Sequence, residues 1–170
     1  TKEGIVFLKR NDGGSGWSIA RRALAVMHTH SVIVEPKSAV IIAGTTVDTI
    51  YVSEEDGHTW ETRDSGITQP DIYSLAAAPV NGKTGIFART QPAHLFFSDD
   101  LGRKWTELPA LRSVDTSDWT FPGPPHVAHT KHNNCHPADT NTIFIGIEVG
   151  GLQKSTDGGQ TFTRITGMDS

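Results

Sequence analysis

Short runs of β-branched, aromatic and aliphatic residues recur along the chain, and clusters of Gly, Pro, Asn and Asp separate them. Runs of this length and composition, bounded by turn residues, are typical of β-strands. Three segments each contain four such runs, predicted at residues 30–34, 39–43, 49–53 and 59–63, at 72–77, 85–89, 94–98 and 104–108, and at 129–133, 142–147, 151–155 and 161–165. Each segment also has a proline (Pro36, Pro79 or Pro137) that we expect in its first turn, where no strand donor is needed.

One octapeptide fills the third turn of every segment. Its form is Ser-x-Asp-x-Gly-x-x-aromatic, and the first copy has Glu in place of Asp. The defining positions are Ser53, Glu55, Gly57 and Trp60, then Ser98, Asp100, Gly102 and Trp105, then Ser155, Asp157, Gly159 and Phe162. Successive serines lie 45 and 57 residues apart (53 to 98, then 98 to 155). Four strands per repeat of about 45 residues indicate the blades of a β-propeller.

The residue types of the octapeptide have a physical reason. A carboxylate in a tight turn accepts hydrogen bonds from the backbone N–H groups that follow it. The Gly two positions later can adopt positive φ without a Cβ clash, and the Ser hydroxyl can close the other side of the loop. The aromatic residue begins the next strand and is expected to pack between sheets. The octapeptide therefore predicts a fixed hairpin turn and a structural role.

We therefore predict an all-β chain, a β-propeller of four-stranded antiparallel blades at residues 28–63, 71–108 and 126–165. Residues 1–20 fit the outer hairpin of a further blade, with a Gly-rich turn before Trp17. Residues 109–125 are expected to form a long loop before the last blade.

Three blades and a hairpin are too few to close a typical ring, since propellers contain about 4–8 blades. The chain could be part of a roughly seven-bladed ring whose remainder lies elsewhere in a longer protein. Two copies could instead associate, or an irregular partner chain could complete the ring. Of these arrangements we expect the first.

The octapeptide resembles the Asp-box, or bacterial neuraminidase repeat, of sialidases, xyloglucanases, sortilin-like receptors and photosystem II assembly factors. The segment from His136 to Gly159 is most similar to bacterial sialidase-like and glycosyl-hydrolase-like proteins. The resemblance implies structural Asp boxes on the face opposite a sialidase active site, and it favours a secreted or periplasmic protein. The Arg-Ile-Pro segment of the sialidase pattern does not occur in the sequence.

Composition and charge exclude several classes of function. The net charge of −4 and the absence of a clustered basic segment argue against a nucleic-acid-binding groove. The apolar runs are too short to span a bilayer, and no basic amphipathic stretch indicates a membrane surface. The single cysteine, Cys135, excludes an internal disulfide framework. We expect no cofactor.

The face opposite the octapeptide turns is where we expect a functional site. Residues eight positions before the three prolines are His28, Asp71 and His129, and residues six positions before them are His30, Tyr73 and Lys131. We expect these residues to surround the mouth of the central channel. Loops on the same face are expected to add Asp48, Arg89, His94 and Glu148, and the long loop adds Asp118 and Trp119.

Our ligand-binding candidates are His28, Asp71, Arg89, His94, Trp119, His129 and Lys131. The spacing of His126, His129 and His132 does not let one strand chelate a metal ion, because neighbours three residues apart point to opposite faces, and we predict no metal site. Glu148 and Asp118 are the candidates for the carboxylate pair of a glycoside hydrolase. We predict a binding or scaffold module for a glycan or protein partner, and a glycosidase of sialidase or xyloglucanase type is the alternative.

Overall fold

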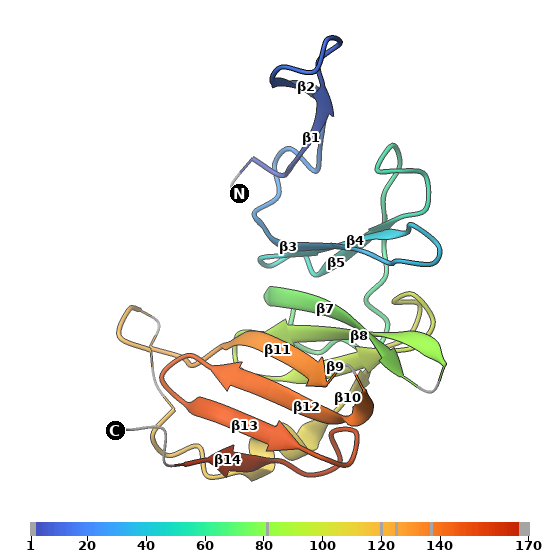
Figure 1. The fold of residues 1–170 in the computed structure, drawn as a ribbon. Helices are drawn as coiled ribbons and strands as arrows, with labels where there is room; N and C mark the ends of the chain where they lie inside the picture. The colour runs from blue at the N-terminus through green and yellow to red at the C-terminus, as the bar shows by residue number, and fades with distance from the viewer. Residues whose placement is uncertain (1–2, 81, 120, 125, 137, 167–170) are drawn as a thin grey trace.

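The chain folds into three four-stranded antiparallel sheets and one two-stranded hairpin (Figure 1). The structure is a computed structural model that describes residues 3–80, 82–119, 121–124, 126–136 and 138–166. It confirms the predicted all-β fold of blade-like sheets. In the described part of the chain, no helix has the length and apolar character needed to cross a membrane.

The sheets follow one another along the sequence. The N-terminal hairpin consists of β1 (Ile5–Arg10) and β2 (Trp17–Ala23). The first blade contains β3 (Thr29–Val34), β4 (Ile41–Thr45), β5 (Ile50–Ser53) and β6 (Glu61–Thr62), and the second contains β7 (Ile72–Val80), β8 (Lys83–Thr90), β9 (Leu95–Ser98) and β10 (Thr106–Glu107). The third blade contains β11 (Thr130–His136), β12 (Asp139–Ile147), β13 (Gly151–Ser155) and β14 (Thr163–Ile165). Within each blade the strands are hydrogen-bonded in sequence order.

Two local details differ from the sequence prediction. Pro79 lies inside β7, opposite Thr84, and not in the first turn of its repeat. The position is tolerated because β7 is an edge strand of its sheet, where one row of backbone groups has no partner strand. The long loop also contains a 3-10 helix over Pro109–Ser113, whose Leu111 is fully buried in the core. Pro137 lies outside the described residues.

All three octapeptides adopt the same backbone conformation. The glycines Gly57, Gly102 and Gly159 have φ of 76°, 82° and 90°. The residue before each glycine is also left-handed, with φ of 51° at Asp56, 60° at Leu101 and 72° at Gly158. The octapeptides are therefore equivalent turns, and two consecutive positive φ angles, not one, define them.

The serine hydroxyl is the hydrogen-bonding centre of each turn. The N–H of the glycine donates to it over 2.8 Å at Ser53, 3.0 Å at Ser98 and 2.8 Å at Ser155. In the last two copies the same hydroxyl donates to the aspartate carboxylate, over 2.8 Å to Asp100 and 2.7 Å to Asp157. Each of these carboxylates then accepts the backbone N–H four residues later, which ties the start of the next strand to the turn.

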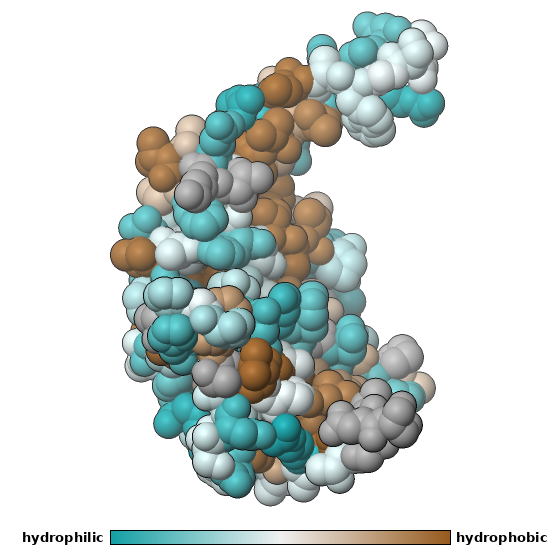
Figure 2. All heavy atoms as spheres, turned by 90° about the vertical axis from the view of Figure 1, so that its left-hand side faces the viewer, coloured by the Kyte–Doolittle hydropathy of each residue, from teal (hydrophilic) through white to brown (hydrophobic). Residues whose placement is uncertain are grey.

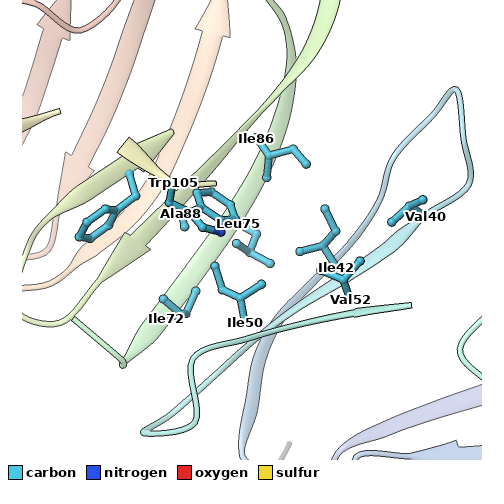
Figure 3. Packing of buried hydrophobic residues seen from close by; sticks show 10 residues of the cluster. Val40, Ile42, Ile50, Val52, Ile72, Leu75, Ile86, Ala88 and Trp105 are labelled. Carbon is cyan, nitrogen blue, oxygen red and sulfur yellow. The ribbon is translucent and has the colours of Figure 1, made fainter. Parts of the chain in front are cut away.

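The turns aim apolar side chains at the preceding blade. Trp105 is buried between the first two blades, and its indole N–H donates to the carbonyl oxygen of Arg63 over 2.9 Å. Figure 3 shows how Ile42, Ile50 and other side chains of the first blade pack against side chains of the second. A second cluster, which includes Phe162, fills the space between the second and third blades. Apolar burial between neighbouring sheets therefore holds the blades together.

The innermost strands β3, β7 and β11 lie beside one another across the blades. The hydroxyl of Ser31 on β3 accepts the backbone N–H of Leu75 on β7 over 3.0 Å. One blade further, the hydroxyl of Ser74 donates to the carbonyl oxygen of Thr130 on β11 over 3.3 Å. The result is a curved, C-shaped molecule in which the N-terminal hairpin forms one arm (Figure 2).

Replacing Ser98 with Ala should leave the buried N–H of Gly102 without its acceptor. An unsatisfied buried donor costs about 1–3 kcal/mol, and urea denaturation should show a loss of that size. Ser65→Ala, a change at an exposed serine, should stay within about 0.5 kcal/mol of the original protein. Equal stability of the two variants would show that the hydroxyl does not hold the turn.

Glu35 links the first blade to the second. Its carboxylate accepts hydrogen bonds from the hydroxyls of Thr84 and Ser38, and these bonds lower its pKa to about 2. Because the pKa is lower in the folded state, the stabilisation is present above the ordinary pKa of 4.5 and is lost as the pH falls towards 2.

We therefore expect Glu35→Gln to lower the free energy of unfolding at neutral pH. The difference from the original protein should shrink steadily below about pH 4.5, as followed by urea titrations at several pH values. Asp12→Asn, in the exposed turn of the hairpin, should show the pH profile of the original protein. A pH-independent difference for Glu35→Gln would contradict the assigned hydrogen bonds.

Candidate functional site

The same β-bulge occurs in the innermost strand of every blade. Between consecutive pairs with the second strand, each innermost strand contains one additional residue. That residue is His30 in β3, Tyr73 in β7 and Lys131 in β11. Bulges re-aim side chains and occur frequently beside active sites. Here one repeated irregularity places three side chains of different chemistry at equivalent positions.

Two of the bulge residues, His30 and Tyr73, belong to a row of aromatic side chains that runs across the three blades. The ring centroids of His28 and His30 are 4.4 Å apart, and those of His30 and Tyr73 are 4.8 Å apart. The ring centroids of Tyr73 and His129 are 3.9 Å apart, and Phe121 completes the row in a T-shaped contact, with its centroid 5.0 Å from that of His129. We call these five residues the aromatic row. Exposure changes along the row, since His28 is exposed, His129 is buried and Phe121 is half-buried.

A cluster of charged side chains lies beside His129, the buried member of the aromatic row. One oxygen of the Glu148 carboxylate lies 2.6 Å from Nε2 of His129 and 3.0 Å from Nζ of Lys131. The hydrogen bond from Lys131 is the largest cause of a lowered pKa at Glu148, and His129 adds to it. Glu148 is therefore ionised at neutral pH. Nδ1 of His129 has no hydrogen-bond partner among the described residues.

A cavity of about 270 Å³ opens over the aromatic row. Thr46 and Gln91, from loops between the second and third strands of their blades, line it together with Asp71, which precedes β7. Asp71 accepts the backbone N–H of Val47 over 2.7 Å, so it joins the loop of the first blade to the entry of the second. The loop between the second and third strands of one blade and the segment that enters the next blade were expected on one face, and they meet at this cavity.

A second cavity, of about 390 Å³, shares His30 and Tyr73 with the first and extends along the innermost strands. Lys131 and Arg89 line this channel wall. The loop position predicted for Arg89 is wrong, because the residue belongs to β8 and is 2% exposed. Burial lowers its pKa to about 10, so the guanidinium remains charged at neutral pH.

Two other candidates lie apart from the aromatic row. His94 contacts Glu107 of the outermost strand β10 over 2.9 Å, and Arg112 binds the same carboxylate. Trp119 packs against the core between the second and third blades, and His94 and Trp119 line a separate shallow pocket. The structure therefore divides the predicted candidates between the channel mouth and this outer pocket.

The two candidate catalytic carboxylates have unrelated partners. Asp118 forms an ion pair with Arg164 on the outermost strand β14. Glu148 is held by residues at the innermost strand. In the described part of the chain, every carboxylate with a resolved pKa shift has a lowered pKa. A glycosidase needs one carboxylic acid with a raised pKa, and Glu148, whose pKa is lowered, does not provide it.

The sequence predicted some of the residues that line the channel mouth. The spacing from the prolines predicted the channel-mouth positions of His28, His30, Asp71, Tyr73, His129 and Lys131, but His30 and Tyr73 were not among the ligand-binding candidates. Their importance comes from the bulges, which the alternation of side chains does not reveal. Among the described residues, no three His, Cys, Asp or Glu side chains are grouped so that they could hold a metal ion.

Known structures with a similar fold are β-propellers. No protein-family model matches the chain, and no curated protein matches it. A structure described as YCF48 bound to D1 peptide aligns with 89% of this chain at a TM-score of 0.61 and 20% identity. The GH74 enzyme of Niastella koreensis aligns with 89% of the chain at a TM-score of 0.58 and 17% identity. The GH74 xyloglucanase of Xanthomonas campestris aligns with 94% of the chain at a TM-score of 0.53 and 16% identity.

The chain spans 44% of the YCF48 chain, 25% of the Niastella enzyme and 23% of the Xanthomonas enzyme. At these identities the likeness establishes the fold alone. The chain thus has the fold of consecutive β-propeller blades.

The environment of His30 leads to a prediction for NMR titration. Partial burial and the nearby His28 lower its pKa below 6.5. Removing His28 by His28→Ala should raise the pKa of His30 towards the ordinary value, because a neighbouring imidazolium no longer opposes its protonation. His58→Ala, at an exposed octapeptide position, should leave it unchanged. An unaltered His30 titration in the His28→Ala protein would disprove the coupling.

Proposed function

We propose that this chain is a binding module that holds a polypeptide segment of a partner protein at the channel mouth. The observation that supports this function is the repeated bulge, which directs His30, Tyr73 and Lys131 from three blades to one surface. Three regular strands would gain nothing in stability from an unpaired residue at the same position. A repeated irregularity that gathers unlike side chains is the pattern expected of a site.

The packing of the aromatic row favours peptide over glycan as the ligand. Sugars bind aromatic residues mainly through a free ring face. Here His30 and Tyr73 stack on each other, and Tyr73 also packs on His129, so neighbouring rings cover much of these faces. The row offers ring edges with N–H and O–H groups. Such donors and acceptors, spaced across adjacent strands, match the regularly spaced amides of an extended polypeptide.

The charged cluster adds complementary partners for a polypeptide. Lys131 is exposed and the Glu148 carboxylate is partly exposed, so both can reach a bound segment. The fold is also compatible with this use, because the similar YCF48 structure is described as bound to a peptide. The low identity means that this likeness supports the scaffold and not the choice of ligand.

The proposed function can be tested with a phage-displayed library of random linear peptides and a glycan array. The protein should select peptides, and their affinity should fall about tenfold or more on Tyr73→Ala or His30→Ala, as for central interface side chains. His58→Ala is the matched control, because it removes an exposed imidazole from an octapeptide turn and should preserve affinity. Peptides that bind the Tyr73→Ala and His30→Ala proteins at full strength, or binding to glycans alone, would refute this assignment.

A further inference from the structure

One position of the repeat is glycine in the first and third blades and arginine in the middle one. Gly44, Arg89 and Gly146 are equivalent, because each is paired with the residue that follows the bulge of its innermost strand. Arg89 is also 2% exposed. Taking a guanidinium out of water costs free energy, and two blades form the same sheet without one. The construction of a blade therefore does not explain this arginine.

The two junctions between blades differ at this position. A Cβ on Gly44 would lie 2.5 Å from the Ile72 side chain, so the first junction has no room for a side chain there. At the second junction, the residue equivalent to Ile72 is Thr130, which is smaller and polar. Arginine and threonine therefore stand at the second junction where glycine and isoleucine meet at the first. A departure from a repeated pattern that buries a charge is expected at a functional site.

Arg89 lines the channel-wall cavity of about 390 Å³. The second cationic side chain of that cavity is Lys131, and two imidazoles, those of His30 and His132, also line it. Its hydroxyl-bearing residues are Ser31, Tyr73 and Ser74. Among the described residues that line the cavity, none is Asp or Glu. The cavity therefore combines two cationic side chains with several hydrogen-bond donors.

Glu148 offsets part of this positive charge from outside the cavity. Its carboxylate contacts Lys131 over 3.0 Å and is shared with His129. Arg89 belongs to a different blade, and it stays charged at neutral pH because burial lowers its pKa to about 10 and no further. Water screens a buried charge less than an exposed one. The guanidinium of Arg89 is therefore the stronger attraction for an anion in this cavity.

We propose that the channel-wall cavity is an anion-binding site in which Arg89 and Lys131 hold a carboxylate or phosphate group. The planar guanidinium matches two oxygens of either group, and the ammonium supplies a compact point charge. The Ser31 hydroxyl accepts the backbone N–H of Leu75 over 3.0 Å and can donate its own hydrogen to the anion. Three neighbouring blades thus contribute to one site.

The anionic group could come from either of two sources. The cavity shares His30 and Tyr73 with the cavity at the channel mouth, so an acidic residue of a polypeptide bound there could enter it. A free small anion would instead enter from solvent. The anion site does not rest on the proposed polypeptide binding, because inorganic phosphate and acetate test it without a peptide.

NMR titration of the full chain with inorganic phosphate and with acetate tests the proposal. Saturable shifts of backbone amides should concentrate at Ser31, Ser74 and His132, and chloride at equal ionic strength should not reproduce them. Arg89→Met removes the charge and keeps a long apolar side chain, and it should weaken phosphate binding about tenfold or more. Arg10→Gln, a change at an exposed arginine of β1, should keep the affinity of the original protein.

Lys131→Gln is the second variant, because the Lys131 side chain is 50% exposed and its replacement leaves the buried junction intact. It should weaken phosphate binding severalfold with an unchanged far-UV circular dichroism spectrum, and it decides the matter if Arg89→Met does not fold. Absence of saturable shifts in the original protein would overturn the proposal. Undiminished phosphate affinity in the Lys131→Gln protein, or in a folded Arg89→Met protein, would overturn it as well.

A competition experiment identifies the source of the anionic group. Peptides that bind at the channel mouth and displace phosphate would assign the group to the polypeptide. Peptide and phosphate bound together would assign it to a free small anion. Both results support the cavity as an anion site, and failure to select any peptide would bear on the proposed function alone.

Discussion

The hydrogen bond from the glycine N–H to the serine hydroxyl in each octapeptide is the interaction on which the rest of the structure depends. Fixing two consecutive residues in the left-handed conformation costs conformational entropy, and this hydrogen bond offsets part of that cost. The turn fixes where the fourth strand begins, and so it decides that Trp105 points at the preceding blade and reaches the carbonyl of Arg63. Stacking of the blades in turn sets the innermost strands side by side, and the channel mouth is built on those strands.

A repeat stacked in this way has two unlike faces, and each blade covers one face of its neighbour. The stability of the array therefore resides in the junctions as much as in the sheets. The two internal junctions bury different apolar sets, with Ile42 and Trp105 in one and Phe87 and Phe162 in the other. Polar contacts such as the hydrogen bond from Thr84 to Glu35 also fix the position of one blade relative to the next.

The channel mouth shows how a regular scaffold can support an irregular site. The bulges at His30, Tyr73 and Lys131 cost one unpaired residue per blade, and they gather imidazole, phenol and ammonium groups that no single strand could bring together. The ionised Glu148 lies beside His129 and Lys131.

The sequence by itself determined the fold class, because strand-length apolar runs, turn residues and the octapeptide are local signals that agree with one another. It also predicted the channel-mouth positions of His28, His30, Asp71, Tyr73, His129 and Lys131, since equal spacing from a repeated proline implies equal height along equivalent strands. The tertiary structure alone decided the rest. A bulge moves one residue out of the alternating pattern without changing composition, so the rank of His30 and Tyr73 was invisible in the sequence. The partners of Glu148 and Asp118 come from other strands or their entries, and only the folded arrangement of the third blade and the long loop determines which charges meet.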